Sequence, residues 1–236
     1  MGIEISFIIP CFNEQDWLPR LLKSLISCKF NFDLVECIIV DNGSTDNTIE
    51  VLWEMITCCK FSVRIVHEPR KGVSLAKNAG ALAAKGKTLV FVDADNLLTQ
   101  EFINNLFYVH YLPDFCGATI RTLAEPGSPR GGILFFLLEA IKMFSPRPFG
   151  KSVVRRDAFF QVGGFDTKVK LGENVIFTSQ LKRYALKNNR LFLHLTSPIY
   201  CSLRRFKKVG YIRILIPWVV AYIGNRNLNY NTIDEL

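Results

Sequence analysis

The sequence predicts an α/β fold, namely one domain with a mostly parallel, doubly wound sheet and helices on both faces. Through the first 93 residues, short apolar runs rich in β-branched residues alternate with segments of helical spacing, which is the pattern of such a sheet. No linker rich in Pro, Gly or Ser divides the 236 residues into two halves. The 49% of apolar and 21% of charged residues supply a buried core and argue against a disordered chain.

Four apolar runs are expected to form buried strands, because each is short and rich in Val and Ile. They span residues 5–9, 35–40, 63–66 and 89–92. Strands that alternate with helices at this spacing indicate parallel pairing.

Three helices are expected between these strands. The first follows Asn13 and Glu14, and the second starts near Ser44 or Thr45, which are both good N-cap residues. The third carries a stripe of small residues, Ala76, Ala79, Gly80 and Ala83. Their spacing of i, i+3, i+4 and i+7 puts them on one face, where they let the helix lie close against a sheet.

The second half of the chain is less regular. Its expected elements are a helix at 99–111, a strand at 118–121, a loop near a ligand at 123–132 and a helix at 174–186. The loop is expected because Pro and Gly are dense in it.

We expect residues 1–208 to form the domain, in two halves at 1–98 and 99–208, and residues 209–236 to form a C-terminal apolar helix and tail. Within that tail, segment 211–224 is shorter than the ~20 apolar residues that a spanning helix needs. Two alternatives stay open for it, a helix packed on the core and an interfacial segment that touches anionic lipid.

Cysteine usage and charge set limits on the class of protein. The seven cysteines are odd in number and form no CxxC pair, so neither a disulfide framework nor a zinc site is favoured. The N-terminus carries no signal-peptide pattern, and a cytoplasmic location is expected. The net charge of +8 is concentrated late in the chain, and a basic face attracts nucleic acid, anionic lipid or a phosphorylated ligand alike.

Polar residues follow three of the predicted strands, at 10–14, 41–46 and 93–95. Ligands gather at the carboxyl ends of strands in a parallel sheet, so these segments are the first candidates for a site. Asp93 and Asp95 offer oxygen ligands of the kind that Mg²⁺ and Mn²⁺ prefer. Each segment also has a plain structural explanation as a turn or a helix cap, but three strand ends of this kind favour a shared site.

In combination, these segments resemble the family 2 glycosyltransferases, which have the GT-A fold. The resemblance is carried by IIPCFNE at 8–14, IVDNGSTDNT at 39–48 and VDAD at 92–95, and it covers roughly residues 3 to 205. It implies a GT-A-like domain and an enzyme that transfers a sugar from a nucleotide-diphosphate donor to an acceptor hydroxyl. A divalent metal, Mg²⁺ or Mn²⁺, would hold the diphosphate. The 1–98 half would then bind the nucleotide-sugar, and the 99–208 half would face the acceptor.

The resemblance also implies roles for individual residues. The base and ribose pocket would be lined by Pro10, Phe12, Asn13 and Glu14. Asp41 would bind the nucleobase, and Lys77 would touch the diphosphate. Asp93 would face the ribose or the donor sugar and, with Asp95, would hold the metal. Arg205 would neutralise the leaving diphosphate.

The expected catalytic base departs from the family's pattern. The family commonly has a Gly-Gly-Phe-Asp turn, here at 163–166, followed by Glu-Asp at a helix start, where this chain has Glu173 and Asn174. An asparagine accepts no proton at neutral pH, so Glu173 is the candidate base of an inverting, in-line displacement. A favourable charge at a helix N-terminus is the competing explanation for Glu173.

Other functions remain as alternatives. A nicotinamide dehydrogenase is disfavoured, because no Gly-x-Gly-x-x-Gly turn follows the first strand, and no phosphate-binding P-loop sequence exists. A sugar nucleotidyltransferase is a closer rival. A non-catalytic module that binds nucleic acid or lipid through the basic segment 204–208 ranks lower, and no nucleic-acid partner is expected. The acceptor is not specified by any motif, and segment 211–224 suggests that it is linked to a lipid on the inner face of a membrane.

Overall fold

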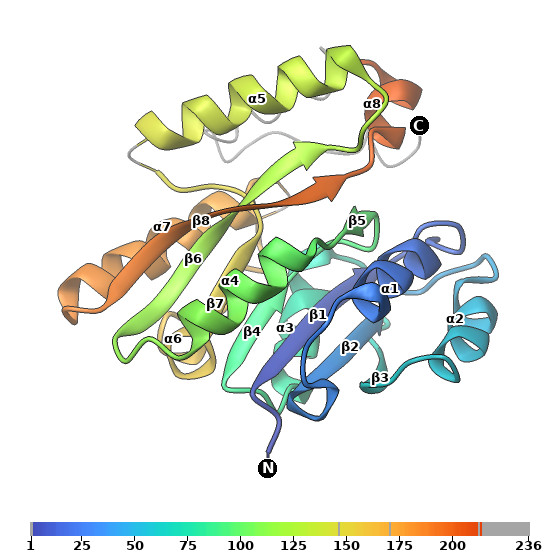
Figure 1. The fold of residues 1–236 in the computed structure, drawn as a ribbon, viewed down its shortest axis with the longest axis horizontal. Coiled ribbons are helices and arrows are strands. Elements are labelled where there is room, and N and C mark those ends of the chain that lie inside the picture. The colour runs from blue at the N-terminus through green and yellow to red at the C-terminus, as the bar shows by residue number, and fades with distance from the viewer. Residues whose placement is uncertain (1, 146, 170, 212, 214–236) are drawn as a thin grey trace.

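The computed structural model describes residues 2–145, 147–169, 171–211 and 213. In this part of the chain, one eight-stranded sheet forms the centre of the molecule, with the order β3-β2-β1-β4-β7-β6-β8-β5 (Figure 1). The strands are β1 (Ile5–Cys11), β2 (Val35–Asp41), β3 (Ser62–His67), β4 (Thr88–Phe91), β5 (Asn96–Leu97), β6 (Phe115–Ala124), β7 (Ser152–Arg155) and β8 (Leu191–Cys201).

The first four strands pair in parallel, as predicted from their alternation with helices. The second half of the chain adds antiparallel pairs, because the short β7 runs against both β4 and β6. Strands β6 and β8 pair in parallel, and β5 runs against β8 at the edge. The predicted α/β class is confirmed, and its parallel part is the half that presents the three polar strand ends.

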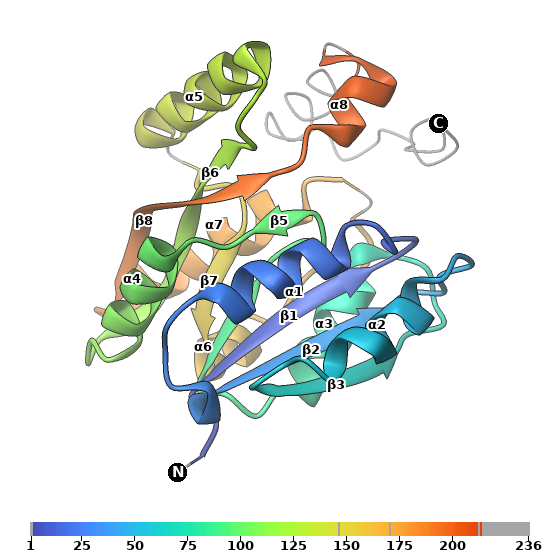
Figure 2. The same ribbon diagram turned by 45° about the vertical axis from the view of Figure 1, so that its right-hand side comes forward.

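Helices cover both faces of the sheet, as predicted for a doubly wound fold (Figure 2). They are α1 (Leu18–Ser27), α2 (Thr48–Ile56), α3 (Val73–Ala83), α4 (Gln100–His110), α5 (Pro129–Phe144), α6 (Arg156–Gln161), α7 (Glu173–Lys187) and α8 (Arg204–Val209), with a 3₁₀ turn, η1, at Phe32–Leu34. One core cluster contains side chains of α1, α2 and α4, and a second contains those of α3, α6 and α7. The two clusters lie on opposite faces of the strands.

Helix α3 lies close to β1 and β2 through its small residues, as the spacing of Ala76 and Gly80 predicts. A Cβ atom added at Gly80 would lie 2.5 Å from Cγ2 of Ile8 and 2.9 Å from Cγ2 of Val40. Both distances are far below van der Waals contact, and both partners are β-branched side chains with little rotamer freedom. This close approach positions the start of α3, and with it Lys77, over the strand ends.

The prediction of a loop at 123–132 is wrong at both ends, and the loop spans only residues 125–128. Strand β6 continues to Ala124, and helix α5 begins at Pro129. The physical reason is a set of helix-start signals, because the Ser128 hydroxyl oxygen accepts a hydrogen bond from the Gly131 backbone N–H at 3.2 Å and proline suits the first helical position. The glycines at 131 and 132 lie inside the first turns of the helix.

The C-terminal helix expected at 211–224 lies, apart from Tyr211 and Arg213, outside the described residues. Among the helices that the structure describes, none combines the length and the apolar composition that crossing a bilayer requires. The division of the chain at residues 98 and 208 stays a prediction.

We expect Gly80→Ala to lower the free energy of unfolding by about 1 to 3 kcal/mol, because the added methyl group overpacks α3 against Ile8 and Val40. Gly132→Ala is the matched control, since Gly132 is also helical but has open space around its Cα. It is expected to be neutral or to stabilise by up to about 1 kcal/mol. Urea denaturation of both variants measures the difference, and equal stabilities would contradict the proposed close packing.

Candidate active site

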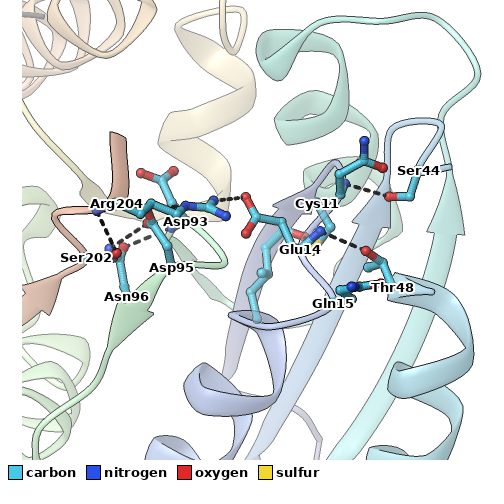
Figure 3. A network of polar contacts seen from close by, with 12 residues as sticks. Cys11, Glu14, Gln15, Ser44, Thr48, Asp93, Asp95, Asn96, Ser202 and Arg204 are labelled. Carbon is cyan, nitrogen blue, oxygen red and sulfur yellow. Dashed lines mark hydrogen bonds and ion pairs between the residues drawn. The ribbon is translucent and has the colours of Figure 1, made fainter. Parts of the chain in front are cut away.

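The three polar segments meet at one edge of the sheet. Strands β1 and β2 are in register so that Cys11 pairs with Asp41, and β4 ends beside β1 on the other side. The segments that follow these strands therefore lie next to one another, with residues of the β8–α8 connection beside them (Figure 3). Asp41 and Asp95, which the sequence assigns to one site, both lie at this edge.

The turns after β1 and β2 are tied together by hydrogen bonds. The Asn13 side-chain oxygen accepts from the Thr45 backbone N–H at 2.8 Å, and the Asn13 N–H donates to the Ser44 hydroxyl at 3.1 Å. The Glu14 N–H donates to the Thr48 hydroxyl at 2.8 Å. Asn13 adopts a left-handed backbone with φ of 55°, which asparagine tolerates better than most residues. The Asn13 side chain thus ties the turn after β1 to the turn after β2, and its expected place in the wall of a base and ribose pocket stays a prediction.

Asp41 is the last residue of β2, next to these turns. Its Oδ1 accepts from the Ser44 backbone N–H at 3.0 Å, and its Oδ2 lies 3.1 Å from Nδ1 of His67 on β3. Burial raises the pKa of Asp41, but the bonds from Ser44 and His67 outweigh it and hold the pKa below its ordinary value. A carboxylate is therefore available at neutral pH. The Phe12 ring beside it is 47% exposed, with the Lys71 ammonium 5.4 Å from its centroid.

Glu14 is paired with an arginine from the other end of the chain. The Arg204 guanidinium, at the start of α8, donates to Glu14, and its Nε lies 3.5 Å from Oδ2 of Asp95 (Figure 3). The backbone N–H of Ser202 also donates to the Asp95 carbonyl at 3.1 Å. Burial raises the pKa of Glu14 to about 7 even though the hydrogen bond from Arg204 lowers it. The β8–α8 connection therefore closes over the end of β4.

Asp93 and Asp95 form a close pair of carboxylates with different surroundings. The Asp93 Oδ2 lies 3.2 Å from Nζ of Lys151, which precedes β7, and 46% of the Asp93 side chain is exposed. The loss of part of its hydration raises the pKa of Asp93, but the charge of Lys151 and those of other nearby cations lower the pKa to about 2. Asp95 is 9% exposed, and burial together with the Asp93 charge raises its pKa. One further cation, Arg205, lowers the pKa of both carboxyl groups.

Two features bear on whether this pair fits a metal ion. In the described part of the chain, no group of three or more His, Cys, Asp or Glu side chains is arranged to hold one. Mg²⁺, however, is commonly bound by one or two carboxylates together with the phosphate oxygens of a substrate. The hard oxygen donors of Asp93 and Asp95, and a buried Glu14 Oε2 that has no hydrogen-bond partner, fit that second kind of site.

Lys77 on α3 forms an ion pair with Glu173, the first residue of α7. The Lys77 Nζ lies 2.9 Å from Oε1 of Glu173 and donates to the side-chain oxygen of Asn174 at 3.0 Å. The Lys77 side chain is 3% exposed and the Glu173 side chain is 12% exposed, so the ion pair is largely shielded from water. The structure thus brings together the residues expected to touch the diphosphate and to act as the base.

The neighbouring residue on α3 fixes the Gly-Gly-Phe-Asp turn. The Asn78 amide donates to the Phe165 carbonyl at 2.8 Å and accepts from the Phe165 N–H at 2.9 Å. Gly164 has φ of +70°, and a Cβ there would lie 2.9 Å from the Asn78 oxygen. The turn is therefore locked to α3, and it leads into Gly172, which begins α7 in a left-handed conformation ahead of Glu173.

Sequence reasoning missed three of the groups that surround the site. Lys151 and His67 carry no local motif, and only the strand register brings them beside Asp93 and Asp41. Arg204 was noted only as part of a basic segment, whereas the structure makes it the partner of Glu14. Arg205, which was expected to face the diphosphate, is exposed, and its charge acts on the Asp93 and Asp95 carboxyl groups.

The sequence matches a known family over most of its length. A sequence model of glycosyl transferase family 2 matches residues 6–209. Glycosyltransferase GlyG of Streptococcus pneumoniae serotype 4 is 32% identical over 104 residues, which are 44% of this chain and 34% of GlyG. Glycosyltransferase AglE of Haloferax volcanii is 26% identical over 188 residues, which are 75% of this chain and 60% of AglE. The chain thus spans about a third of the first relative and less than two thirds of the second.

Solved structures share the fold at low identity. TarS 1-349 of S. aureus, in complex with UDP-GlcNAc, superposes with a TM-score of 0.69 at 19% identity. The match covers 99% of this chain and 70% of the TarS chain. The mannosyltransferase PcManGT of Pyrobaculum calidifontis, in complex with GDP-Man and Mn²⁺, gives a TM-score of 0.69 at 17% identity and covers 99% of this chain and 68% of its own. At these identities the likeness shows the fold alone.

The raised pKa of Glu14 makes stability depend on pH. Because the folded-state pKa of about 7 lies above the ordinary 4.5, the folded chain holds this proton more tightly, and its free energy of unfolding should fall as pH rises through that window. We expect Glu14→Gln to remove this contribution, which is on the order of 3 kcal/mol. Urea denaturation of both proteins between pH 5 and pH 8 measures it, and parallel curves would contradict it.

Proposed function

Because the chain belongs to glycosyl transferase family 2, we propose that it transfers a sugar from a nucleoside-diphosphate donor to an acceptor hydroxyl. The observation that carries the proposal is the convergence of Asp41, the Asp93–Asp95 pair and the Lys77–Glu173 pair around the carboxyl ends of three parallel strands. The solved neighbours that hold UDP-GlcNAc or GDP-Man support a donor of this chemical class.

The donor would lie across the strand ends with its base toward Asp41. The Asp41 carboxylate accepts hydrogen bonds from a pyrimidine or purine N–H, and the exposed Phe12 ring offers an apolar surface beside it. Pro10 and Asn13 shape the same wall. The diphosphate would then lie between Asp95 and the ammonium group of Lys77.

The charges of the site favour a divalent metal bound together with the donor. The carboxyl groups of Glu14, Asp93, Asp95 and Glu173 lie among the four cations of Lys77, Lys151, Arg204 and Arg205, so the site has little excess positive charge. A donor diphosphate adds roughly two negative charges, which a divalent ion offsets. Asp95 and Asp93 would hold Mg²⁺ or Mn²⁺, and the ion would neutralise the charge that develops on the leaving diphosphate.

Glu173 would act as the general base. In the donor-free protein its carboxylate is held by Lys77, and a bound diphosphate would compete for that ammonium group and release the carboxylate. The carboxylate would accept the proton of the acceptor hydroxyl while that oxygen attacks the anomeric carbon. The bond from this carbon to the diphosphate breaks at the same time, its electron pair leaves with the diphosphate, and the anomeric centre inverts.

Asn174 would orient the base through Lys77. Its side-chain oxygen accepts a hydrogen bond from the same ammonium group that contacts Glu173. The acceptor itself, including one linked to lipid, and a cytoplasmic location with membrane contact stay predictions, because the apolar segment 211–224 on which they depend lies mainly outside the described residues.

A panel of nucleotide-sugars tests the donor class by thermal shift, with and without Mn²⁺. We expect one donor to raise the melting temperature more strongly when Mn²⁺ is present, because the ion joins the diphosphate to Asp95. Asp95→Asn should lose the Mn²⁺-dependent part of the shift, whereas Asp33→Asn, an exposed aspartate in η1, should keep it. Shifts without any dependence on Mn²⁺ would contradict the metal proposal.

Glu173→Gln should lower the turnover number by about 10²- to 10⁴-fold and leave donor affinity nearly unchanged, because only proton transfer is lost. Glu101→Gln is the matched control, since Glu101 also lies in the first turn of a helix, α4, and carries the same favourable end charge. Turnover is followed by release of nucleoside diphosphate. Equal small losses in both variants would assign Glu173 to helix stabilisation alone.

A further inference from the structure

Helix α5 has the reverse of the polarity expected for a surface helix. Two of its three charged residues face the sheet, since the side chains of Glu139 and Lys142 are each 9% exposed and form an ion pair. The Glu139 carboxylate also accepts a hydrogen bond from the Thr122 backbone N–H on β6 at 3.0 Å and lies 3.5 Å from Nε2 of His194. A buried polar network thus fixes which side of α5 faces inward.

The outer side of α5 is apolar. It presents four large side chains that are 53% to 64% exposed, namely Ile133, Phe136, Leu137 and Ile141. Their spacing of three, four and eight residues puts them in one stripe along the helix. A stripe of this size on the water side of a helix marks a surface that contacts another apolar phase, because isolated apolar residues rather than continuous stripes are the norm on protein surfaces.

Exposed cations lie at one end of this stripe. Arg130 is exposed in the first turn of α5, and helix α8 packs against α5 with the Phe206 ring centroid 5.9 Å from that of Phe135. On α8, Lys207 and Lys208 are exposed. No Asp or Glu occurs in the sequence between residues 173 and 234, so no acidic residue of α8 itself offsets the charge of these lysines.

We propose that the outer face of α5, together with the exposed cations of α8, docks on the surface of an anionic lipid bilayer. An apolar helix face with cations beside it is the arrangement that binds such an interface, the apolar side chains entering the acyl boundary while the cations meet the headgroups. A second copy of the chain fits this surface less well, because the apolar stripe of another α5 offers no negative charge to the cations of α8.

The proposed surface is one helix away from the candidate active site. Helix α8 contacts α5 through Phe206 and begins at Arg204, which pairs with Glu14 beside Asp95. Figure 1 shows α5 and α8 together at the end of the molecule toward which β1 points. A bilayer in contact with α5 would therefore lie near the strand ends. The proposal itself does not depend on the transferase activity.

Vesicle binding of the full chain tests the proposal. The apolar variant is Phe136→Ser with Leu137→Ser, and its matched control is Tyr108→Ser with Leu186→Ser, which removes one exposed aromatic and one exposed leucine elsewhere. Both proteins keep residues 209–236, so any difference between them reports on α5. We expect the α5 variant to bind vesicles of phosphatidylcholine with phosphatidylglycerol at least about tenfold more weakly, and the control to bind like the unmodified chain.

A charge variant, Lys207→Glu with Lys208→Glu, tests the same surface through its cations. It should weaken binding to the anionic vesicles, and added salt should weaken the binding of the unmodified chain. Absence of binding by the unmodified chain, or equal binding by the α5 variant and its control, would overturn the proposal. A dimer in sedimentation velocity that the α5 variant turns into a monomer, without vesicle binding, would assign the face to a second copy. The thermal shift that the donor causes is measured on the same variants. If that shift is unchanged while vesicle binding is lost or absent, the result concerns the proposed lipid surface and not the proposed function.

Discussion

Parallel pairing of β1, β2 and β4 is the constraint on which the rest of the site depends. Parallel strands end at the same edge of a sheet, so three segments far apart in the sequence are brought together by backbone hydrogen bonds alone. The register of Cys11 with Asp41 then places Asp41 level with the end of β1. Helix α3 can approach this edge only because Gly80 lacks a side chain, and its position brings Lys77 to Glu173.

A second feature is that almost every charge in the site already has an opposite charge beside it. Arg204 holds Glu14, Lys151 holds Asp93, and Lys77 holds Glu173. Pairing is required because an isolated buried charge is strongly destabilising. In the proposed complex, a diphosphate with a divalent ion would replace some of these contacts, so the paired charges would exchange one set of partners for another. The Arg204 contact also joins α8, and through it α5, to the strand ends.

The sequence predicted the parallel half of the fold well, because its strands and helices are regular and its strand ends carry polar residues. The second half was predicted less well for identifiable reasons. Strand β7 has four residues, and its partners are set by long-range register rather than by local pattern, so Lys151 could not be assigned to the site. Helix α5 was missed because its polarity is reversed, with Glu139 and Lys142 inside, and because Pro129 and the following glycines resemble a loop.

If one metal-bound diphosphate joins the ends of β1, β2 and β4, a crystal structure with Mn²⁺ and a nucleoside diphosphate will show it. We expect an anomalous manganese peak at coordination distance from a carboxylate oxygen of Asp95, with the diphosphate between that ion and Lys77 and the base beside Asp41. A nucleotide bound away from these strand ends, or a manganese ion without contact to Asp95, would contradict it.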